Sequence, residues 1–379
     1  MNTPENCSPD LTQVRSDAAE AASSAISGDR KNNNFNFLRL LLAVLVILAH
    51  SPELVDGTND REILTQIFHT ETFGSLAVNG FFALSGYLIL QSWWGNPQPF
   101  DFLKKRILRI YPGFVVASLL SAFVFGPMGA RAADYFAQFN FFEFIKEMLL
   151  LRAPSVPPVF AGSQFPVVNG SLFTIEYEFR CYLLVAVFGI SGILRRRRLW
   201  LALTISAIAL SIASDLVRNV SFPGEDLLIS DPGWFVKFLS FFSAGGCFYL
   251  FRDRIRYKPI YVLVALPAVI LSMFTWESCK LILPTLGAYI FFGFAFTHLP
   301  ILQEFGTHSD ISYGVYLYAW PTQKLLLWYF PSLSPWLLFV LACGISFACG
   351  LLSWHLVERP FLRLKPSRKI APVGNSKGG

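Results

Sequence analysis

The sequence predicts an all-α fold, a polytopic transmembrane helix bundle of about ten spans with both termini in the cytoplasm. Hydrophobic residues make up 54% of the 379 residues and charged residues only 15%, whereas soluble chains carry about 25% charged residues. The apolar residues gather in stretches of about 20 residues, the length that crosses a bilayer as a helix. In addition, basic residues are concentrated in every second segment between these stretches.

The chain divides into a polar start, a long apolar domain and a basic end. Residues 1–34 are expected to be a disordered cytoplasmic tail, because they lack the apolar residues that a core requires. They also lack the apolar run of a cleavable signal peptide. The membrane domain is predicted over 35–358, followed by a basic cytoplasmic tail, 359–379. The predicted spans are residues 35–51, 73–93, 110–127, 172–194, 199–217, 234–251, 259–275, 279–297, 311–330 and 335–355.

The distribution of Lys and Arg supports an even number of spans and an N-terminus in the cytoplasm. Cytoplasmic loops of membrane proteins carry an excess of these residues, and a miscounted span would reverse every later loop. The basic segments expected inside are residues 30–31, 104–109, 195–198, 252–258 and 359–369. A proline-rich piece within 128–171 cannot be one lipid-facing helix. An eleventh span or a re-entrant piece within 136–171 stays open.

The first predicted span carries two ionisable residues on one face. Arg39 and His50 are eleven residues apart, which returns to almost the same side of a helix at about 100° per residue. The separation along the axis is roughly 16 Å. Ionisable groups at this depth are costly and usually functional. The alternative is that the arginine reaches one membrane interface and the histidine caps the other end.

The fourth predicted span carries two carboxylates that differ in their local partners. Glu176 and Arg180 are four residues apart, so they share a helix face and can pair. Glu178 points roughly 200° away from Glu176 and lacks a local cation. A carboxylate in a membrane helix needs a partner from another helix, and Arg39 or His50 is expected to supply it. The alternative is an inter-helix pair that only stabilises the bundle.

Two arginines are expected at the cytoplasmic mouth of the third span. Arg106 and Arg109 are three residues apart, and guanidinium groups match phosphate oxygens in shape and charge. Ordinary anchoring to lipid headgroups is the alternative. No His or Cys stands at metal-ligand spacing, so no metal site is predicted. There is no basic run interleaved with aromatic residues, and no nucleic-acid partner is predicted.

Six segments in order resemble the acyltransferase-3 family of integral membrane O-acyltransferases. Besides the pair Arg39 and His50, they are VNGFFALSGYLI at 78–89, the R-x-x-R of FLKKRILRIYP at 102–112, NGSLFTIEYEFRCYLL at 169–184, ISYGVYLYAWP at 311–321 and HLVERPF at 355–361. Three positions depart from the family pattern. Asn79 replaces an aspartate, Phe173 a tryptophan, and Ala319 stands where many members carry a histidine.

The resemblance implies an enzyme of the bacterial inner (cytoplasmic) membrane that transfers an acyl group to a hydroxyl. Acetyl-CoA would be the donor, as a co-substrate, and a cell-envelope or exported glycan or glycolipid would be the acceptor. Membrane lipid would be its other partner. No metal would be needed.

The resemblance also assigns roles to individual residues. His50 would be the general base, with an acyl-histidine relay as the less favoured variant. Arg39 would stabilise the thioester oxyanion or bind the donor, and Glu178 would orient or charge-balance His50 or Arg39. Arg106 and Arg109 would hold CoA phosphates. For substrate binding we expect Asn79 and Tyr182.

Two other functions fit a polytopic chain with intramembrane charges. A transporter or flippase for a glycan or a lipid-linked saccharide is the main alternative, although the two-halves repeat common in transporters is not evident. A non-catalytic scaffold for polysaccharide export is the third possibility, because fold alone does not imply activity.

Overall fold

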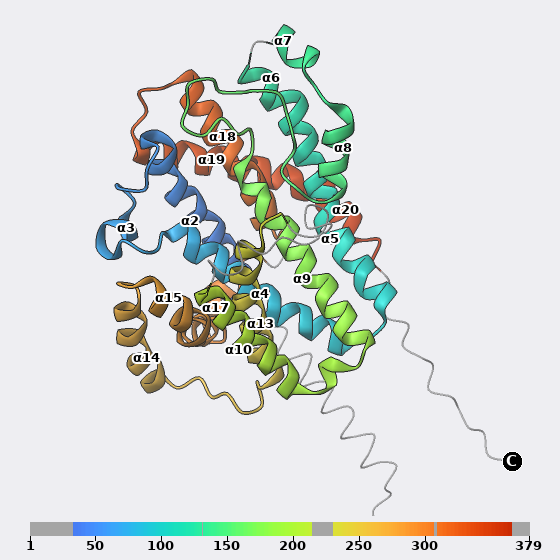
Figure 1. Ribbon diagram of the computed structural model, residues 1–379, viewed down its shortest axis with the longest axis vertical. Helices are drawn as coiled ribbons and strands as arrows, with labels where there is room; N and C mark the ends of the chain where they lie inside the picture. Colours follow the sequence, from blue (N-terminus) through green and yellow to red (C-terminus); the bar gives the residue numbers. More distant parts are fainter. Residues whose placement is uncertain (1–32, 131, 214–229, 307–308, 366–379) are drawn as a thin grey trace, which may run out of the picture.

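The computed structural model describes residues 33–130, 132–213, 230–306 and 309–365, and every regular element in these ranges is a helix. Most of the predicted tail 1–34, the end of the tail 359–379 and the end of the fifth predicted span lie outside the described residues. The long helices are α2 (Phe35–Asp56), α4 (Phe73–Gly95), α5 (Pro99–Leu120), α9 (Phe173–Ile190), α10 (Arg197–Ile212), α13 (Pro232–Leu250), α14 (Pro259–Ser272), α18 (Ser312–Tyr329) and α19 (Pro335–Ser353) (Figure 1).

Short elements connect or extend these helices. The short α-helices are α3 (Ile63–Phe68), α6 (Gly126–Met128), α7 (Ala132–Ala137), α8 (Phe141–Leu149), α15 (Trp276–Ile282), α16 (Ala288–Ala295), α17 (Pro300–Glu304) and α20 (Arg359–Leu362). The 3₁₀ turns are η2 (Gly170–Leu172) and η3 (Ile193–Arg195). Three π-helical segments, η1 (Ser121–Phe125), η4 (Leu283–Gly287) and η5 (Trp354–Glu358), join neighbouring α-helices into continuous rods.

The helix bundle is confirmed, and each of the ten predicted ranges contains helix in the described part of the chain. Five helical stretches there are long and apolar enough to cross a membrane: Phe35–Asp56, Phe73–Gly95, Pro99–Met128, Trp276–Ala295 and Pro335–Leu362. Helices α10 and α14 are shorter, at 16 and 14 residues. Ten membrane spans and cytoplasmic termini therefore stay predictions.

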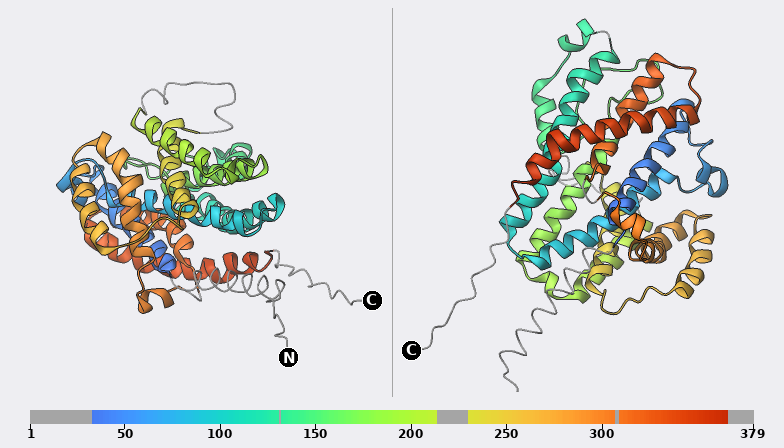
Figure 2. Two further views of the ribbon diagram at one scale, coloured as in Figure 1. Left: turned by 90° about the horizontal axis from the view of Figure 1, so that it is seen from below. Right: turned by 180° about the vertical axis from the view of Figure 1, so that it is seen from behind.

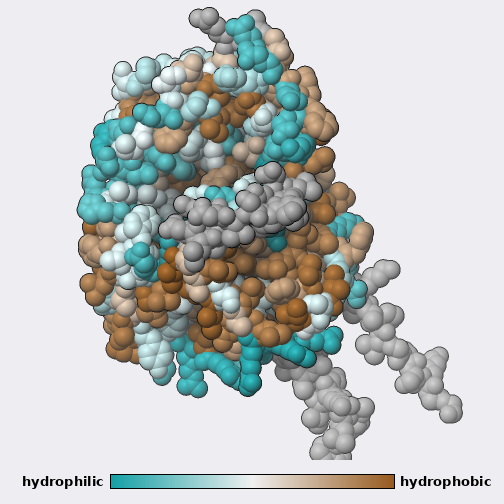
Figure 3. All heavy atoms as spheres, viewed as in Figure 1, coloured by the Kyte–Doolittle hydropathy of each residue, from teal (hydrophilic) through white to brown (hydrophobic). Residues whose placement is uncertain are grey.

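The surface of the bundle agrees with a membrane protein. Figure 3 shows a band of hydrophobic residues across one face, with hydrophilic residues gathered above it and along its lower edge. Large apolar side chains on α14 and α19, such as Leu263, Val264 and Leu352, are more than half exposed. Such residues are stable at a surface that faces lipid rather than water.

The third helix begins earlier than predicted. Proline at the first helical position and Asp101 in the first turn start α5 at Pro99 rather than near residue 110, and both features favour a helix N-terminus. The continuous apolar run in the sequence covers only the second half of this helix, so the predicted span began too late. Arg106 and Arg109 therefore lie on regular helix rather than just before it.

The last helix is also longer than predicted. It continues from α19 through η5 into α20 and ends at Leu362 rather than near 355. The start of the predicted tail, at 359, is thus helical. Figure 2 shows this rod lying across α5, and η5 and α20 both contact α5.

Helix α4 is at the centre of the bundle because glycines allow close approach. A Cβ atom on Gly86 would lie 1.8 Å from the Phe242 carbonyl oxygen of α13, and one on Gly245 would lie 1.9 Å from the Ala83 carbonyl oxygen. Small residues commonly permit such contact between membrane helices, as the composition of residues 73–93 predicts. This contact fixes the position of α4, one face of which lines the cavity described below.

The segment between α6 and α9 forms a cap at one end of the bundle. Its proline-rich part is not helical, in agreement with the prediction, and α8 has only nine residues. Residues 160–167, the cap loop, pack on α18, where Trp320 Nε1 donates to the Val167 carbonyl at 3.1 Å and Lys324 Nζ donates to Ser163 Oγ at 2.7 Å. The cap loop therefore covers this end of α18.

Substitution of Gly86 tests the central contact. Gly86→Val should lower the free energy of unfolding by about 3 kcal/mol, because the side chain forces two backbones apart. Gly344→Ala, in α19, is the control, since a Cβ atom there meets nothing within 4 Å. Thermal unfolding in detergent measures both, and an unchanged Tm for Gly86→Val would contradict the packing.

Candidate functional site

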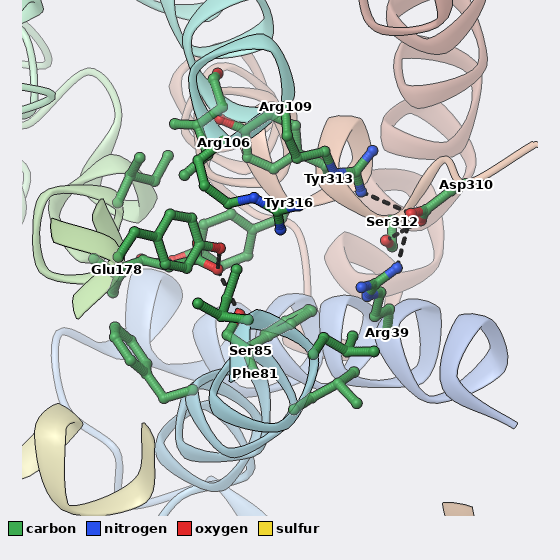
Figure 4. Close-up of a pocket in the computed structure, with 18 of the residues that line it drawn as sticks. Arg39, Phe81, Ser85, Arg106, Arg109, Glu178, Asp310, Ser312, Tyr313 and Tyr316 are labelled. Carbon is green, nitrogen blue, oxygen red and sulfur yellow. Dashed lines mark hydrogen bonds and ion pairs between the residues drawn. The ribbon is translucent and has the colours of Figure 1, made fainter. Parts of the chain in front are cut away.

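A cavity of about 310 Å³ lies among α2, α4, α5, α9 and α18, with the end of the last rod at its edge (Figure 4). Its walls combine charged groups with aromatic and aliphatic side chains. The residues that line it are Arg39, Val78, Phe81, Phe82, Leu84, Ser85, Leu88, Ile89, Arg106, Arg109, Ile110, Thr174, Ile175, Glu178, Tyr182, Asp310, Ser312, Tyr313, Tyr316, Trp354, Leu362 and Lys365. Four of them are cationic and two are carboxylates.

Asp310 connects three elements of the cavity wall. Its Oδ2 accepts from Arg39 Nη1 at 3.1 Å and from Arg109 Nη2 at 2.7 Å, while Ser312 Oγ donates to Oδ1 at 2.6 Å. Both ion pairs are marked in Figure 4. Glu358, which is 2% exposed, adds a second carboxylate 3.5 Å from Arg109. Arg39 and Arg109 are thus held in fixed positions and largely charge-balanced.

Arg106 differs from the two other arginines. Its Nη2 donates to Ser92 Oγ at 3.3 Å and its guanidinium lies 5.7 and 6.0 Å from the rings of Phe102 and Tyr182, and within the described ranges it forms no ion pair with a carboxylate. Its Nε is buried without a hydrogen-bond partner in these ranges. A guanidinium with open donors beside a cavity can bind an anion.

Glu178 has hydroxyl partners rather than cations. Its Oε1 accepts from Ser85 Oγ at 2.6 Å and also from the Tyr182 hydroxyl. The expectation that Arg39 or His50 pairs with it is wrong, because Asp310 holds Arg39 and because His50 is not a lining residue. Glu178 therefore places a carboxylate in the cavity wall opposite Arg39 and Asp310 (Figure 4).

Glu176 belongs to a separate buried network. The predicted pair with Arg180 is confirmed at 3.2 Å, and Arg152 Nε lies 3.1 Å from the other carboxylate oxygen. Ser230 donates to Glu176 through both its backbone N–H and its hydroxyl. Since this network joins three chain segments away from the cavity lining, we assign it a structural role.

His50 lies on the same helix as Arg39 but in a different environment. Its Nδ1 is 2.6 Å from Glu53 Oε2, and its ring meets Trp320 edge-on at 4.9 Å between centroids. Its side chain is 23% exposed. His50 is not among the residues that line the cavity, and its partly exposed side chain can be reached from outside the protein.

Tyr316 lies on the same helix as the residue that contacts His50. Its hydroxyl donates to the Ser171 carbonyl and shares a hydrogen bond with Thr174, both at 2.7 Å, and its ring packs against Phe81 at 5.9 Å. Tyr316 lines the cavity, whereas Trp320, one turn further along α18, contacts His50. Helix α18 thus carries residues of both the cavity wall and the surroundings of His50.

A family model described as "Acyltransferase domain" (Acyl_transf_3) matches residues 32–355. The chain belongs to the acyltransferase-3 family. It is 28% identical over 350 residues to an O-acetyl transferase of Shigella phage Sf6, an alignment that covers 88% of this chain and 96% of the relative. It is 25% identical over 381 residues to nodulation protein 10 of Rhizobium leguminosarum bv. viciae, covering 90% and 95%. No solved structure matches the chain.

The positions that depart from the acyltransferase-3 pattern lie outside the cavity lining. Asn79, expected to bind substrate, is 2% exposed, and its amide atoms have no hydrogen-bond partner in the part of the chain described. Phe173 begins α9 and packs against Trp234 at 5.7 Å between centroids. Ala319 is 1% exposed in a cluster with residues of α2. Tyr182, the other residue expected to bind substrate, lines the cavity, and its role in substrate binding stays a prediction.

Several residues of this acyltransferase's site were not identified from the sequence. Ser85 and Glu358 are within segments that carry the family resemblance, and Asp310 directly precedes another. Glu53 is three residues after His50, a spacing that places two side chains together on a helix. Lys365 follows the last helix, and no sequence pattern around it indicates a residue of a binding site.

Neutralising Asp310 should destabilise this acyltransferase. Asp310→Asn leaves Arg39 and Arg109 without the carboxylate that they share, and removal of one partner from a buried pair costs about 3 kcal/mol of unfolding free energy. The control is Asp253→Asn, which breaks an exposed pair with Arg197 and should cost less than about 1 kcal/mol. Equal losses of Tm in the two variants would show that the carboxylate shared by Arg39 and Arg109 stabilises the protein no more than an exposed ion pair does.

Proposed function

We propose that this chain is a membrane O-acyltransferase that moves an acyl group, acetyl as the family default, from cytoplasmic acyl-CoA to a hydroxyl of a cell-envelope or exported glycan. The observation that carries the donor assignment is the cationic cavity with Arg106 left open for an anion. Coenzyme A is rich in phosphate, and arginine is the side chain best suited to phosphate oxygens. The O-acetyl transferase relative supports the reaction class.

The cavity suits the narrow part of an acyl donor. Its volume of about 310 Å³ is at the lower end for small-molecule sites, so we infer that it takes the thioester arm. Arg106 and Lys365 would hold phosphate groups, and the apolar walls formed by Phe81, Phe82 and Leu88 would surround the arm and the acyl group. Arg39 and Arg109, already paired with Asp310, would supply a fixed positive field rather than new ion pairs.

His50 would act on the acceptor. An acceptor hydroxyl oxygen attacks the thioester carbonyl carbon while His50 takes the hydroxyl proton. The carbon–sulfur bond breaks, the ester forms, and coenzyme A leaves as a thiolate. Because His50 does not line the cavity, the thioester would have to leave the cavity to reach it, and we propose that it does so beside Tyr316, one turn of α18 before Trp320.

Removal of Arg106 should weaken donor binding. Arg106→Ala should raise the KM for acetyl-CoA by about 10-fold or more, since hydrogen bonds to charged groups contribute about 1.5–3 kcal/mol. Arg106→Lys should retain part of the affinity because the charge remains. Arg197→Ala, at an exposed arginine outside the cavity, is the control. An unchanged KM for acetyl-CoA in Arg106→Ala would show that Arg106 does not bind the donor.

Removal of His50 should abolish transfer. His50→Ala should accumulate in membranes at the wild-type level but move no label from radiolabelled acetyl-CoA into the glycan fraction of those membranes, because it lacks the base. His355→Ala, at an exposed histidine of η5, is the control. An active His50→Ala enzyme would disprove the base. Glycan movement into liposomes without any acyl donor would support the transporter instead.

A further inference from the structure

The carboxylate of Glu53 is in direct contact with His50, and the local helix explains the contact. Residues three apart on a helix share a face, and here Nδ1 and Oε2 are 2.6 Å apart. Glu53 and His50 are 20% and 23% exposed, so an acceptor can reach the pair. We propose that Glu53 is a positioning residue that fixes the tautomer and orientation of the His50 imidazole. This inference depends on the proposed role of His50 as the base.

The position of Glu53 is unfavourable for the helix itself. It lies near the C-terminal end of α2, which ends at Asp56 and is followed by Gly57 in the left-handed conformation. A helix C-terminus stabilises cations and disfavours carboxylates. Asp56, the other carboxylate there, is balanced by Arg61, whereas the ion-pair partner of Glu53 within the described ranges is His50. A role in α2 stability therefore does not explain Glu53.

The surroundings hold the pair in place. Trp320 of α18 covers one side of the imidazole, and Phe165 of the cap loop packs against Trp320 at 6.1 Å between centroids. Gln323 Nε2 donates to the Ile47 carbonyl at 3.0 Å and to Ser51 Oγ at 2.8 Å, which fixes α2 beside α18. The nearest cation along α18, Lys324, donates to Ser163 of the cap loop.

The contact determines which imidazole nitrogen can accept a proton. An ionised carboxylate only accepts hydrogen bonds, so Nδ1 must carry the hydrogen that lies between it and Glu53. In the neutral imidazole the lone pair is then on Nε2, on the opposite side of the ring from Glu53. Nε2 is therefore the atom that takes the acceptor proton. A glutamine at position 53 could instead donate to Nδ1 and favour the opposite tautomer.

The kinetic test compares the full-length enzyme with three variants in nanodiscs, using acetyl-CoA and lipid-linked glycan extracted from the producing cells. Glu53→Gln should lower kcat by about 10-fold or more, because the wrong tautomer cannot serve as base, and leave the KM for acetyl-CoA unchanged. Glu53→Asp should recover part of kcat. Asp56→Asn is the matched control, one turn further along, and should keep wild-type kcat.

Thermal unfolding in detergent separates positioning from a structural effect. If Glu53 only positions His50, Glu53→Gln should keep the wild-type Tm while its kcat falls. Wild-type kcat in Glu53→Gln, or an equal loss in Asp56→Asn, would overturn the proposal. An active His50→Ala enzyme would instead show that His50 is not the general base. This second outcome distinguishes failure of the proposed function from failure of the inference about Glu53.

A spectroscopic measurement does not depend on activity or on the folding of any Glu53 variant. The chain has five histidines, so nitrogen-15 NMR of the histidine-labelled wild type, with His50→Gln for assignment, can identify the His50 signals. In its neutral form, the His50 imidazole should carry its hydrogen on Nδ1. A hydrogen on Nε2 would overturn the proposal.

Discussion

The carboxylate of Asp310 is the interaction on which the arrangement of the cavity depends. It joins Arg39 of α2 to Arg109 of α5, residues that are 271 and 201 positions away from it in the chain. Two guanidinium groups this close would repel each other in a buried site, where charge is weakly screened. With Asp310 between them, the two helices can approach and form one wall. Of the three arginines that line the cavity, Arg106 is the one without an ion pair to a carboxylate in the described ranges.

Local patterns were sufficient to predict much of the fold but less of the site. Apolar runs located the helices, small residues predicted the close packing of α4, and spacing of four residues predicted the pair of Glu176 and Arg180. The same runs placed the start of α5 too late, because Asp101, Lys104 and Lys105 interrupt the apolar residues of its first two turns. Arg106 and Arg109 look equivalent in sequence, and only distant carboxylates, Asp310 and Glu358, distinguish them.

Glu178 and His50 show why helix periodicity cannot identify partners in space. Periodicity placed Arg39 and His50 on one face, which led to the expectation of a common site with Glu178. The cavity wall is formed instead by several helices, and His50 is not among the residues that line it. Hydroxyl groups from Ser85 and Tyr182 satisfy Glu178, and serine and tyrosine carry no charge pattern that a sequence search could match to a carboxylate.

The π-helical segment Trp354–Glu358 has a consequence for how this protein can vary. A π turn contains one residue more than an α turn, so the helix is wound more loosely there. Deleting a single residue within this turn would restore regular winding and leave the residues beyond it in nearly the same rotational phase, because the π turn takes up the extra residue in one turn. Deleting a residue from the regular part of α19 would instead rotate everything beyond it by about 100° around the axis and turn Glu358 away from Arg109. Loss of one residue should therefore be better tolerated within Trp354–Glu358 than in α19 before it.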